Sequence, residues 1–211
     1  MRLYHHPFAS NARRALLVAQ QLGITLELVE LNLMDPGDRR RLEQVNPNSK
    51  LPVLVDGDFV LWESCAIMQY LCDITPGQTL YPEQARARAD ANRWLFWISQ
   101  HLGPALRVLV WENLWKGKTG NGAPDPREQA RGAADIAPLA ALIDRHLAGR
   151  RWVVGDSLTL ADFALATSFI YLDQARLPVT GCANLMAWFA RVQALDVWQG
   201  AAALSEAPAT L

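Results

Sequence analysis

The sequence lacks several features that would place it in common protein classes. Its three cysteines, an odd number, argue against a disulfide framework. Cys65 and Cys72 lie on one predicted helix, about 10.5 Å apart at the helical rise, which is too far for a disulfide. No apolar run reaches the length of a membrane span, and the N-terminal MRLYHHPFAS lacks the apolar core of a signal peptide. These absences favour the reducing cytoplasm and predict no membrane partner.

The chain also lacks an excess of either charge. Lys and Arg number 20 against 21 acidic residues, so the formal net charge is −1. Such a balance gives no electrostatic reason to expect binding to nucleic acid or to an anionic membrane. Apolar residues make up 51% of the 211 positions, which is enough to build one large core or two small ones.

The first third of the chain alternates between strand and helix patterns. We expect strands at 2–4 and 25–31, helices at 12–22 and 39–44, and then a strand hairpin that leads into a helix. This order predicts a mixed sheet with helices on both faces. Residues 74–82 are rich in turn formers and have no periodicity, which is typical of a linker. We therefore predict a first domain at 1–73, a linker at 74–82 and a second domain at 83–211.

The second domain shows helical patterns only. A long helix is expected at 83–102, bent or interrupted by Gly103-Pro104 and continued at 105–115. A further helix begins with Asp125-Pro126 and carries a kink at Pro138. Thr159 and Asp162 are spaced as a capping box at the start of another helix.

The most informative segment runs from Asn46 to Leu71, NPNSKLPVLVDGDFVLWESCAIMQYL. Pro52 stands where an apolar strand begins, a position that suits a cis bond. Asp56-Gly57 is a strong hairpin dipeptide. Ser64 then opens a helix, whose free N–H groups and dipole form a seat for a carboxylate ligand.

Asn46-Pro47, Leu51-Pro52 and Glu63-Ser64 together resemble the second half of the thioredoxin-like domain in the glutathione transferase family. The Thr159–Asp162 pair is similar to the capping box in the helical domain of that family, so the resemblance covers nearly the whole chain. It implies an α/β thioredoxin-like N-terminal domain followed by an all-helical C-terminal domain, as in the cytosolic, serine-type, theta or bacterial-like members.

The same resemblance implies a set of glutathione contacts. Glu63 would meet the γ-glutamyl amino group, and Ser64 would take the neighbouring carboxylate. Leu51, presented by a cis Pro52, would pair its backbone with the cysteinyl residue. Lys50 would reach the glycine carboxylate, although a solvated lysine is an alternative explanation.

A hydroxyl that stabilises the glutathione thiolate is expected just after the first strand. In serine-type members of the family, the catalytic serine lies at this place, four residues before an arginine. Ser10 and Arg14 match that spacing. The alternative is that Ser10 only caps the first helix; Asn11 and then Tyr4 are the substitutes for the catalytic role. No cysteine lies near position 10, which favours a conjugating transferase over a thiol oxidoreductase.

Two further groups of residues could take part in chemistry: two adjacent histidines, and the aromatic residues around the Gly-Pro bend. The adjacent His5 and His6 point to opposite faces of a strand, which argues against a paired metal site, and no metal is expected. Aromatic residues around the Gly-Pro bend suit flat hydrophobic electrophiles, although a buried aromatic core is the alternative. The predicted substrate pocket comprises Phe8, Trp97, His101, Trp111 and Trp115.

We therefore expect a transferase that conjugates glutathione, as co-substrate, to hydrophobic electrophiles, with peroxidase activity as an addition. A glutathione-dependent isomerase, dehalogenase or ether-cleaving lyase is the alternative on the same scaffold, and a non-catalytic glutathione-binding interaction module is another. The resemblance also implies a homodimer.

Overall fold

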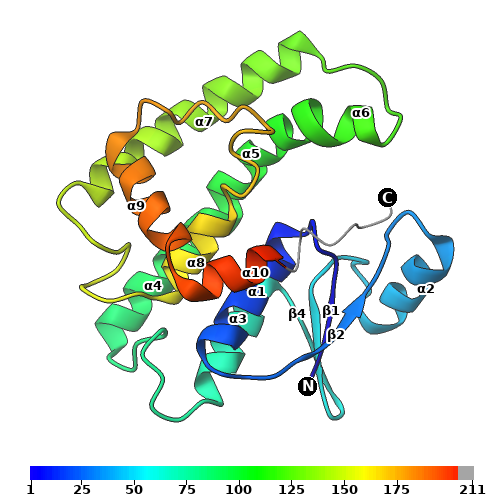
Figure 1. Cartoon of the computed structure of the whole chain (residues 1–211), viewed down its shortest axis with the longest axis vertical. Coiled ribbons are helices and arrows are strands. Elements are labelled where there is room, and N and C mark those ends of the chain that lie inside the picture. The colour runs from blue at the N-terminus through cyan, green and yellow to red at the C-terminus, as the bar shows by residue number, and fades with distance from the viewer. Residues whose placement is uncertain (204–211) are drawn as a thin grey trace. The chain divides into compact units, whose positions relative to one another are not determined.

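The computed structural model describes residues 1–203, which fall into two compact units (Figure 1). The first comprises Met1–Tyr81 together with the segment that starts at Gln193, and the second comprises Pro82–Val192. The change from one unit to the other after Tyr81 falls within the segment 74–82. The exact domain limits, 1–73 and 83–211, stay a prediction. The segment that starts at Gln193 groups with the first unit, whereas the prediction assigns it to the second domain.

The first unit has the predicted β-α-β-α-β-β-α order. Its elements are β1 (Arg2–His5), α1 (Ser10–Gln21), β2 (Glu27–Glu30), α2 (Pro36–Val45), β3 (Val53–Asp56), β4 (Phe59–Trp62), α3 (Ser64–Asp73) and, from the end of the chain, α10 (Asp196–Ala203). The strands form one mixed sheet in the order β2-β1-β3-β4. β1 is parallel to β2 and antiparallel to β3, and β3 is antiparallel to β4. This is the thioredoxin-like arrangement expected from the sequence.

Helices cover both faces of this sheet: α1, α3 and α10 lie on one face and α2 on the other (Figure 1). Under α2, Leu31, Leu42 and Val53 form a buried cluster, against which Tyr4 and Leu51 pack. Leu3 and Leu54, paired next to Tyr4 and Val53 in the sheet, are fully buried and face the other layer. The alternation of apolar residues along β1 and β3 thus builds a core on each side.

The β3–β4 hairpin is present, but its turn is displaced by one residue from the prediction. Asp56 pairs with Phe59 in the ladder, so the two loop residues are Gly57 and Asp58 rather than Asp56 and Gly57. Gly57 takes a φ of 61°, which glycine adopts without steric cost. Asp56 instead ends the strand and accepts a hydrogen bond of 2.7 Å from the Tyr70 hydroxyl of α3.

The second unit is helical throughout its regular elements. They are α4 (Ala85–Trp97), the π-helical turn η1 (Ile98–Leu102), α5 (Gly103–Val110), a second π-helical turn η2 (Trp111–Trp115), α6 (Lys116–Lys118), α7 (Pro126–Leu147), α8 (Leu160–Thr167) and α9 (Ala183–Gln193). Gly103-Pro104 does not break the path from α4 to α6. The Gly103 N–H bonds to the Ile98 carbonyl five residues back, a wide turn placed directly before the proline that lacks a donor.

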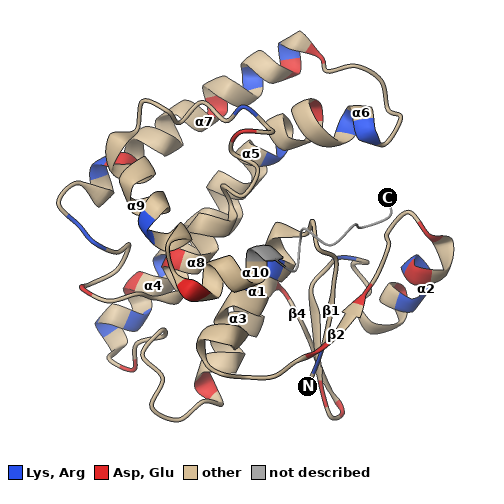
Figure 2. Ribbon diagram, viewed as in Figure 1, with Lys and Arg blue, Asp and Glu red and all other residues tan. Residues whose placement is uncertain are grey.

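Helices α2 and α7 carry charges of both signs. Figure 2 shows both signs on α2 and on α7. On α7, Arg131 forms ion pairs with Glu128 and Asp135. On α2, Arg41 lies 3.2 Å from Asp38. Exposed pairs of this kind contribute little to stability, about 0–1 kcal/mol each.

Helix α8 is the buried centre of the second unit, since all eight of its residues are buried. The predicted capping box is confirmed at its start, where the Asp162 carboxylate accepts the backbone N–H of Thr159 at 2.9 Å. The same carboxylate also accepts the Thr159 hydroxyl, the Val153 N–H and the Trp188 indole N–H. Asp162 therefore joins α8, the loop before it and α9.

Candidate functional site

The register of the sheet brings three of the predicted site segments to one edge. Tyr4 of β1 pairs with Val53 of β3, and Val53 pairs with Trp62 of β4. The next row along these strands therefore holds the end of β1, Pro52 and Glu63, with neighbouring strands about 4.8 Å apart. The first helix, the proline-led strand and the Glu63-Ser64 junction thus open on the same edge of the sheet.

The Glu63-Ser64 junction has an unusual backbone. Glu63 takes a φ of 71° and a ψ of 110°, a conformation that costs a non-glycine residue about 1–3 kcal/mol. The Glu63 side chain is exposed, whereas Ser64, the first residue of α3, is buried at 6% exposure. Strain of this kind persists only where the surrounding structure imposes it. Here the strained residue is an exposed glutamate that directly precedes the N–H groups at the start of α3.

The loop before β3 is held by Asn46, which is 2% exposed. Its side-chain amide donates to the Lys50 carbonyl at 2.7 Å, and its Oδ1 accepts the Asn48 N–H at 2.9 Å. The Leu51–Pro52 bond is cis, as predicted. The Lys50 side chain is exposed and Leu51 is half-buried. This positioning role of Asn46 is not evident from the Asn46-Pro47 motif, although Asn side chains commonly hydrogen-bond backbone groups a few residues away.

Helix α1 begins at Ser10, two residues before the start predicted at residue 12. Ala9 is the N-cap and makes no side-chain capping bond, so Ser10 is the first helical residue. Within residues 1–203, the half-buried Ser10 hydroxyl makes no hydrogen bond to protein. The proposed alternative for Ser10, a plain N-cap, is therefore wrong. Asn11 is exposed at the second position.

One turn after Ser10, Arg14 connects α1 to the start of α3. Arg14 is 5% exposed, and its Nη1 lies 3.9 Å from the Sγ of Cys65, the residue that follows Ser64. Residues four apart share a face of a helix, so Ser10 lies on the side of α1 that faces this region.

Tyr4, the last substitute for the catalytic role, is placed elsewhere. It is half-buried in the cluster beneath α2, and its hydroxyl interacts with the Arg2 guanidinium and raises the pKa of Arg2. Its polar end thus lies toward the beginning of β1, whereas Ser10 follows the end of that strand.

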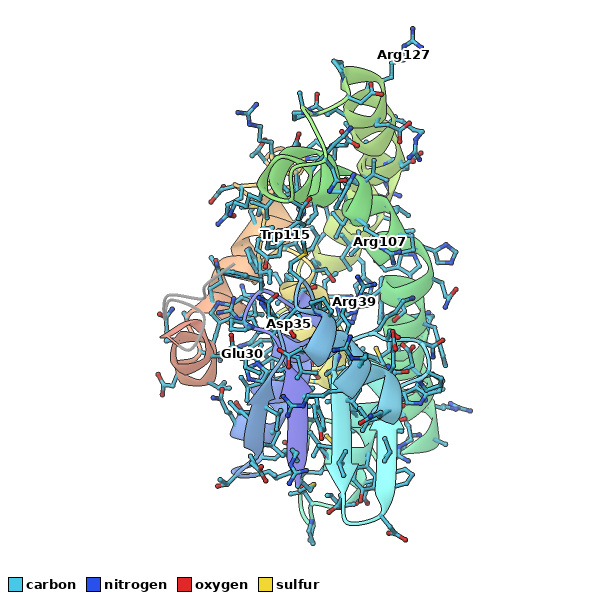
Figure 3. All side chains as sticks on the ribbon, turned by 90° about the vertical axis from the view of Figure 1, so that its right-hand side faces the viewer. Glu30, Asp35, Arg39, Arg107, Trp115 and Arg127 are labelled. Carbon is cyan, nitrogen blue, oxygen red and sulfur yellow. The ribbon has the colours of Figure 1, made fainter. Side chains whose placement is uncertain are left out.

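In the second unit, the residues predicted for the substrate pocket have different neighbours. Trp97 contacts Trp94 edge to face, with centroids 5.3 Å apart. Both line a groove of about 460 Å³ between α4 and α7, together with Arg93, Leu142, Arg145 and His146. Trp115 of η2, labelled in Figure 3, packs edge to face on Tyr171 at 5.9 Å.

The other predicted pocket residues are more open. His101 and Trp111 are exposed, and Trp111 shows 40% of its surface. Phe8, in the first unit, is half-buried, and its ring contacts that of His6. Exposed aromatic surface at Trp111 and a partly buried ring at Trp115 are compatible with an apolar binding wall.

The structure also bears on ions and membranes. Among residues 1–203, no group of three or more His, Cys, Asp or Glu side chains is arranged to hold a metal ion. No helix in the described part of the chain is both long and apolar enough to cross a membrane.

Comparison with known proteins adds a family assignment to this geometry. Residues 3–79 match the glutathione S-transferase N-terminal domain, and residues 126–191 match the glutathione S-transferase C-terminal domain. The chain is 32% identical over 206 residues to glutathione S-transferase 3 of Zea mays, covering 94% of this chain and 91% of the relative. It is also 32% identical to glutathione S-transferase theta-2B of Homo sapiens, with 87% and 76% covered.

Solved structures of glutathione S-transferases share the fold of this chain. A glutathione S-transferase from Rhodospirillum rubrum F11 superposes with a TM-score of 0.86 at 27% identity, over 100% of this chain and 93% of that one. The apo form of glutathione S-transferase III gives a TM-score of 0.83 at 29% identity, over 100% and 99% of the two chains.

Proposed function

Because this chain belongs to the glutathione S-transferase family and is a glutathione transferase, we propose that the sheet edge described above binds glutathione and activates its thiol. The observation that supports this assignment is the strained backbone of Glu63, an exposed acidic residue that directly precedes the N-terminus of α3. The γ-glutamyl end of glutathione has an ammonium and a carboxylate on one carbon. A carboxylate next to a helix N-terminus is complementary to that pair.

The remaining contacts follow from the same edge. The Ser64 hydroxyl and N–H take the γ-glutamyl carboxylate, and the Leu51 backbone, next to cis Pro52, pairs with the cysteinyl residue. The exposed Lys50 reaches the glycine carboxylate. No metal takes part in this proposal, and glutathione acts as co-substrate.

Ser10 donates its hydroxyl hydrogen to the thiolate. A free thiol has a pKa of about 8.5, so a preorganised donor at a helix N-terminus raises the fraction that is ionised at neutral pH. Ser10 suits this role because its hydroxyl has no protein partner among the described residues. Asn11 is the substitute.

The second substrate in this proposal is a flat hydrophobic electrophile. The residues proposed to contact it are Phe8, Trp97, His101, Trp111 and Trp115. Of these, Trp111 exposes 40% of its surface and so offers an open aromatic face to a substrate. Turnover with a panel of chloronitrobenzenes, hydroperoxides and halogenated substrates tests the reaction type. Conjugation forms a thioether of glutathione and expels the halide, so halide release without that thioether, or activity confined to peroxide reduction, would contradict simple conjugation.

Glutathione affinity should depend on Glu63. We expect Glu63→Ala to weaken binding at least about tenfold, because a charged hydrogen bond contributes roughly 1.5–3 kcal/mol. Calorimetric titration with glutathione measures this. Glu43→Ala, which removes an exposed carboxylate on α2, serves as the matched control. Equal affinity for glutathione in wild type and a folded Glu63→Ala protein would remove Glu63 from the site.

We also propose a homodimer in the cytoplasm. The edge strand β4 pairs on one side only and exposes Phe59, Val60 and Trp62 at 38–46%. An open apolar edge is an interaction surface, and a twofold contact would close on itself at two subunits. Cys65, Cys72 and Cys182 form no disulfide in the described part of the chain, which suits a reducing compartment.

Light scattering at low micromolar concentration should give about twice the chain mass of 23.4 kDa. Val60→Lys is expected to shift this equilibrium toward the monomer, since it places a charge on the open edge. Leu33→Lys, at a similarly exposed apolar residue in the β2–α2 loop, should leave the mass unchanged. Wild type that scatters as a single chain would contradict the dimer.

A further inference from the structure

The loop between β1 and α1, residues 6–9, is organised by His6. Its backbone carbonyl accepts the Ala9 N–H at 2.9 Å. Its side-chain Nδ1 accepts the Phe8 N–H at 3.2 Å. One residue therefore satisfies two successive backbone donors of the loop, in the way that an Asn or Asp side chain closes a turn on the N–H two residues ahead.

Ring packing reinforces this turn. The imidazole of His6 and the ring of Phe8 lie 5.4 Å apart at 50°, and both residues are half-buried. Pro7 between them has a fixed φ, which restricts the loop further. Ala9 then begins the helix by accepting the Arg13 N–H at 3.0 Å. The place of Ser10, the next residue, follows directly from this turn.

We propose that His6 is a positioning residue for Ser10: its neutral imidazole holds the β1–α1 loop closed and thereby fixes where the serine hydroxyl meets the thiolate. The inference rests on the role of Ser10 proposed above. His6 itself acts through the Phe8 N–H and touches neither substrate.

The contact depends on the protonation state of the ring. Nδ1 accepts a hydrogen bond only if its lone pair is free, so the neutral ring carries its proton on Nε2. A second proton would turn Nδ1 into a donor facing the Phe8 N–H donor, and the turn would open. Acidification therefore releases the loop.

The surroundings keep His6 neutral near pH 7. Burial lowers the pKa of His6 below its ordinary value of about 6.5, and the Glu30 carboxylate opposes part of this shift. Glu30 ends β2 and is labelled in Figure 3. His5, the other titratable neighbour, also has its pKa lowered by burial. Because the folded-state pKa lies below the unfolded one, the stabilisation is present above about pH 6.5 and is lost as the pH falls through the lower value.

Two substitutions separate the hydrogen bond from the titration. In His6→Asn, the side-chain oxygen can replace Nδ1 as acceptor and cannot be protonated in this range, so turnover at neutral pH should stay within about twofold of wild type. In His6→Leu the acceptor is gone, and we expect kcat to fall about tenfold while KM for glutathione changes less than about twofold. His5→Asn, at the last residue of β1 and outside the loop, is the control and should keep wild-type kcat.

The Phe8 backbone amide gives a readout that needs no ligand. In wild type, its NMR resonance should move with the same midpoint as the His6 ring when the pH is lowered, and in folded His6→Asn it should not move. The inference would be overturned if the Phe8 amide resonance did not move when His6 ionises, or if the His6→Leu enzyme kept wild-type kcat. Failure of wild type to bind glutathione would instead contradict the proposed function, and the amide titration would still decide whether His6 holds the loop.

Discussion

Replacing Asp162 by alanine is expected to lower the free energy of unfolding by about 3–5 kcal/mol. The substitution leaves four donors without their acceptor: the backbone N–H groups of Val153 and Thr159, the Thr159 hydroxyl and the Trp188 indole N–H. Asp162 is fully buried, and burial raises the pKa of its carboxyl. A buried donor left unsatisfied costs about 1–3 kcal/mol, and partial relaxation keeps the total below the simple sum.

Urea unfolding measures this loss. Asp162→Asn should lose less, since its Oδ1 can still accept from one pair of donors while its amide group faces the other. The control is Asp156→Ala, six residues earlier and exposed, which should leave the midpoint unchanged. A free energy of unfolding for Asp162→Ala within about 0.5 kcal/mol of wild type would mean that the four hydrogen bonds do not stabilise the helical unit.

Ser10→Ala is expected to reduce kcat by about 100-fold or more, because removal of one preorganised donor to a developing anion typically costs 10²–10³ in rate. The fold should be unaffected, since the Ser10 hydroxyl makes no capping bond in α1. Glutathione affinity should change little, because the hydroxyl acts on sulfur and not on the ends of the tripeptide.

Three measurements on the same variant separate these effects: kcat, the calorimetric Kd for glutathione, and the thiolate absorbance of the bound complex as a function of pH. The thiolate titration should move to higher pH in Ser10→Ala. Asn11→Ala is the control, one residue further along α1. If Asn11→Ala shifts the titration and Ser10→Ala does not, the thiolate donor is Asn11.

The fold could be predicted because its signals are local. A hairpin dipeptide, an alternating strand pattern and a capping box each act within a few residues, and β3, β4 and α8 formed where they indicated. The one-residue shift of the hairpin turn shows the limit of such signals. Asp56 was predicted as a turn residue, but it pairs with Phe59 and bonds the Tyr70 hydroxyl of a helix. Contacts between elements of this kind are not encoded in a hairpin dipeptide.

The candidate site could be predicted only in part for the same reason. Glu63 and Ser64 are adjacent in sequence and their junction was evident. The positive φ of Glu63, the contact of Arg14 with Cys65 and the hydrogen bond from Phe8 to His6 depend on how strands and helices meet. Sequence spacing carries no information on such contacts, so the turn that His6 closes could not be predicted.

The proposed pairing of Glu63 with the amino group of the γ-glutamyl residue is measured directly by a calorimetric double-mutant cycle. The two ligands are glutathione and the analogue in which that amino group is replaced by hydrogen; the two proteins are wild type and Glu63→Ala. On wild type, the analogue should bind at least about tenfold more weakly than glutathione, and on Glu63→Ala the two ligands should bind alike. The same loss of affinity for the analogue on both proteins would contradict the account, because the amino group would then be recognised elsewhere.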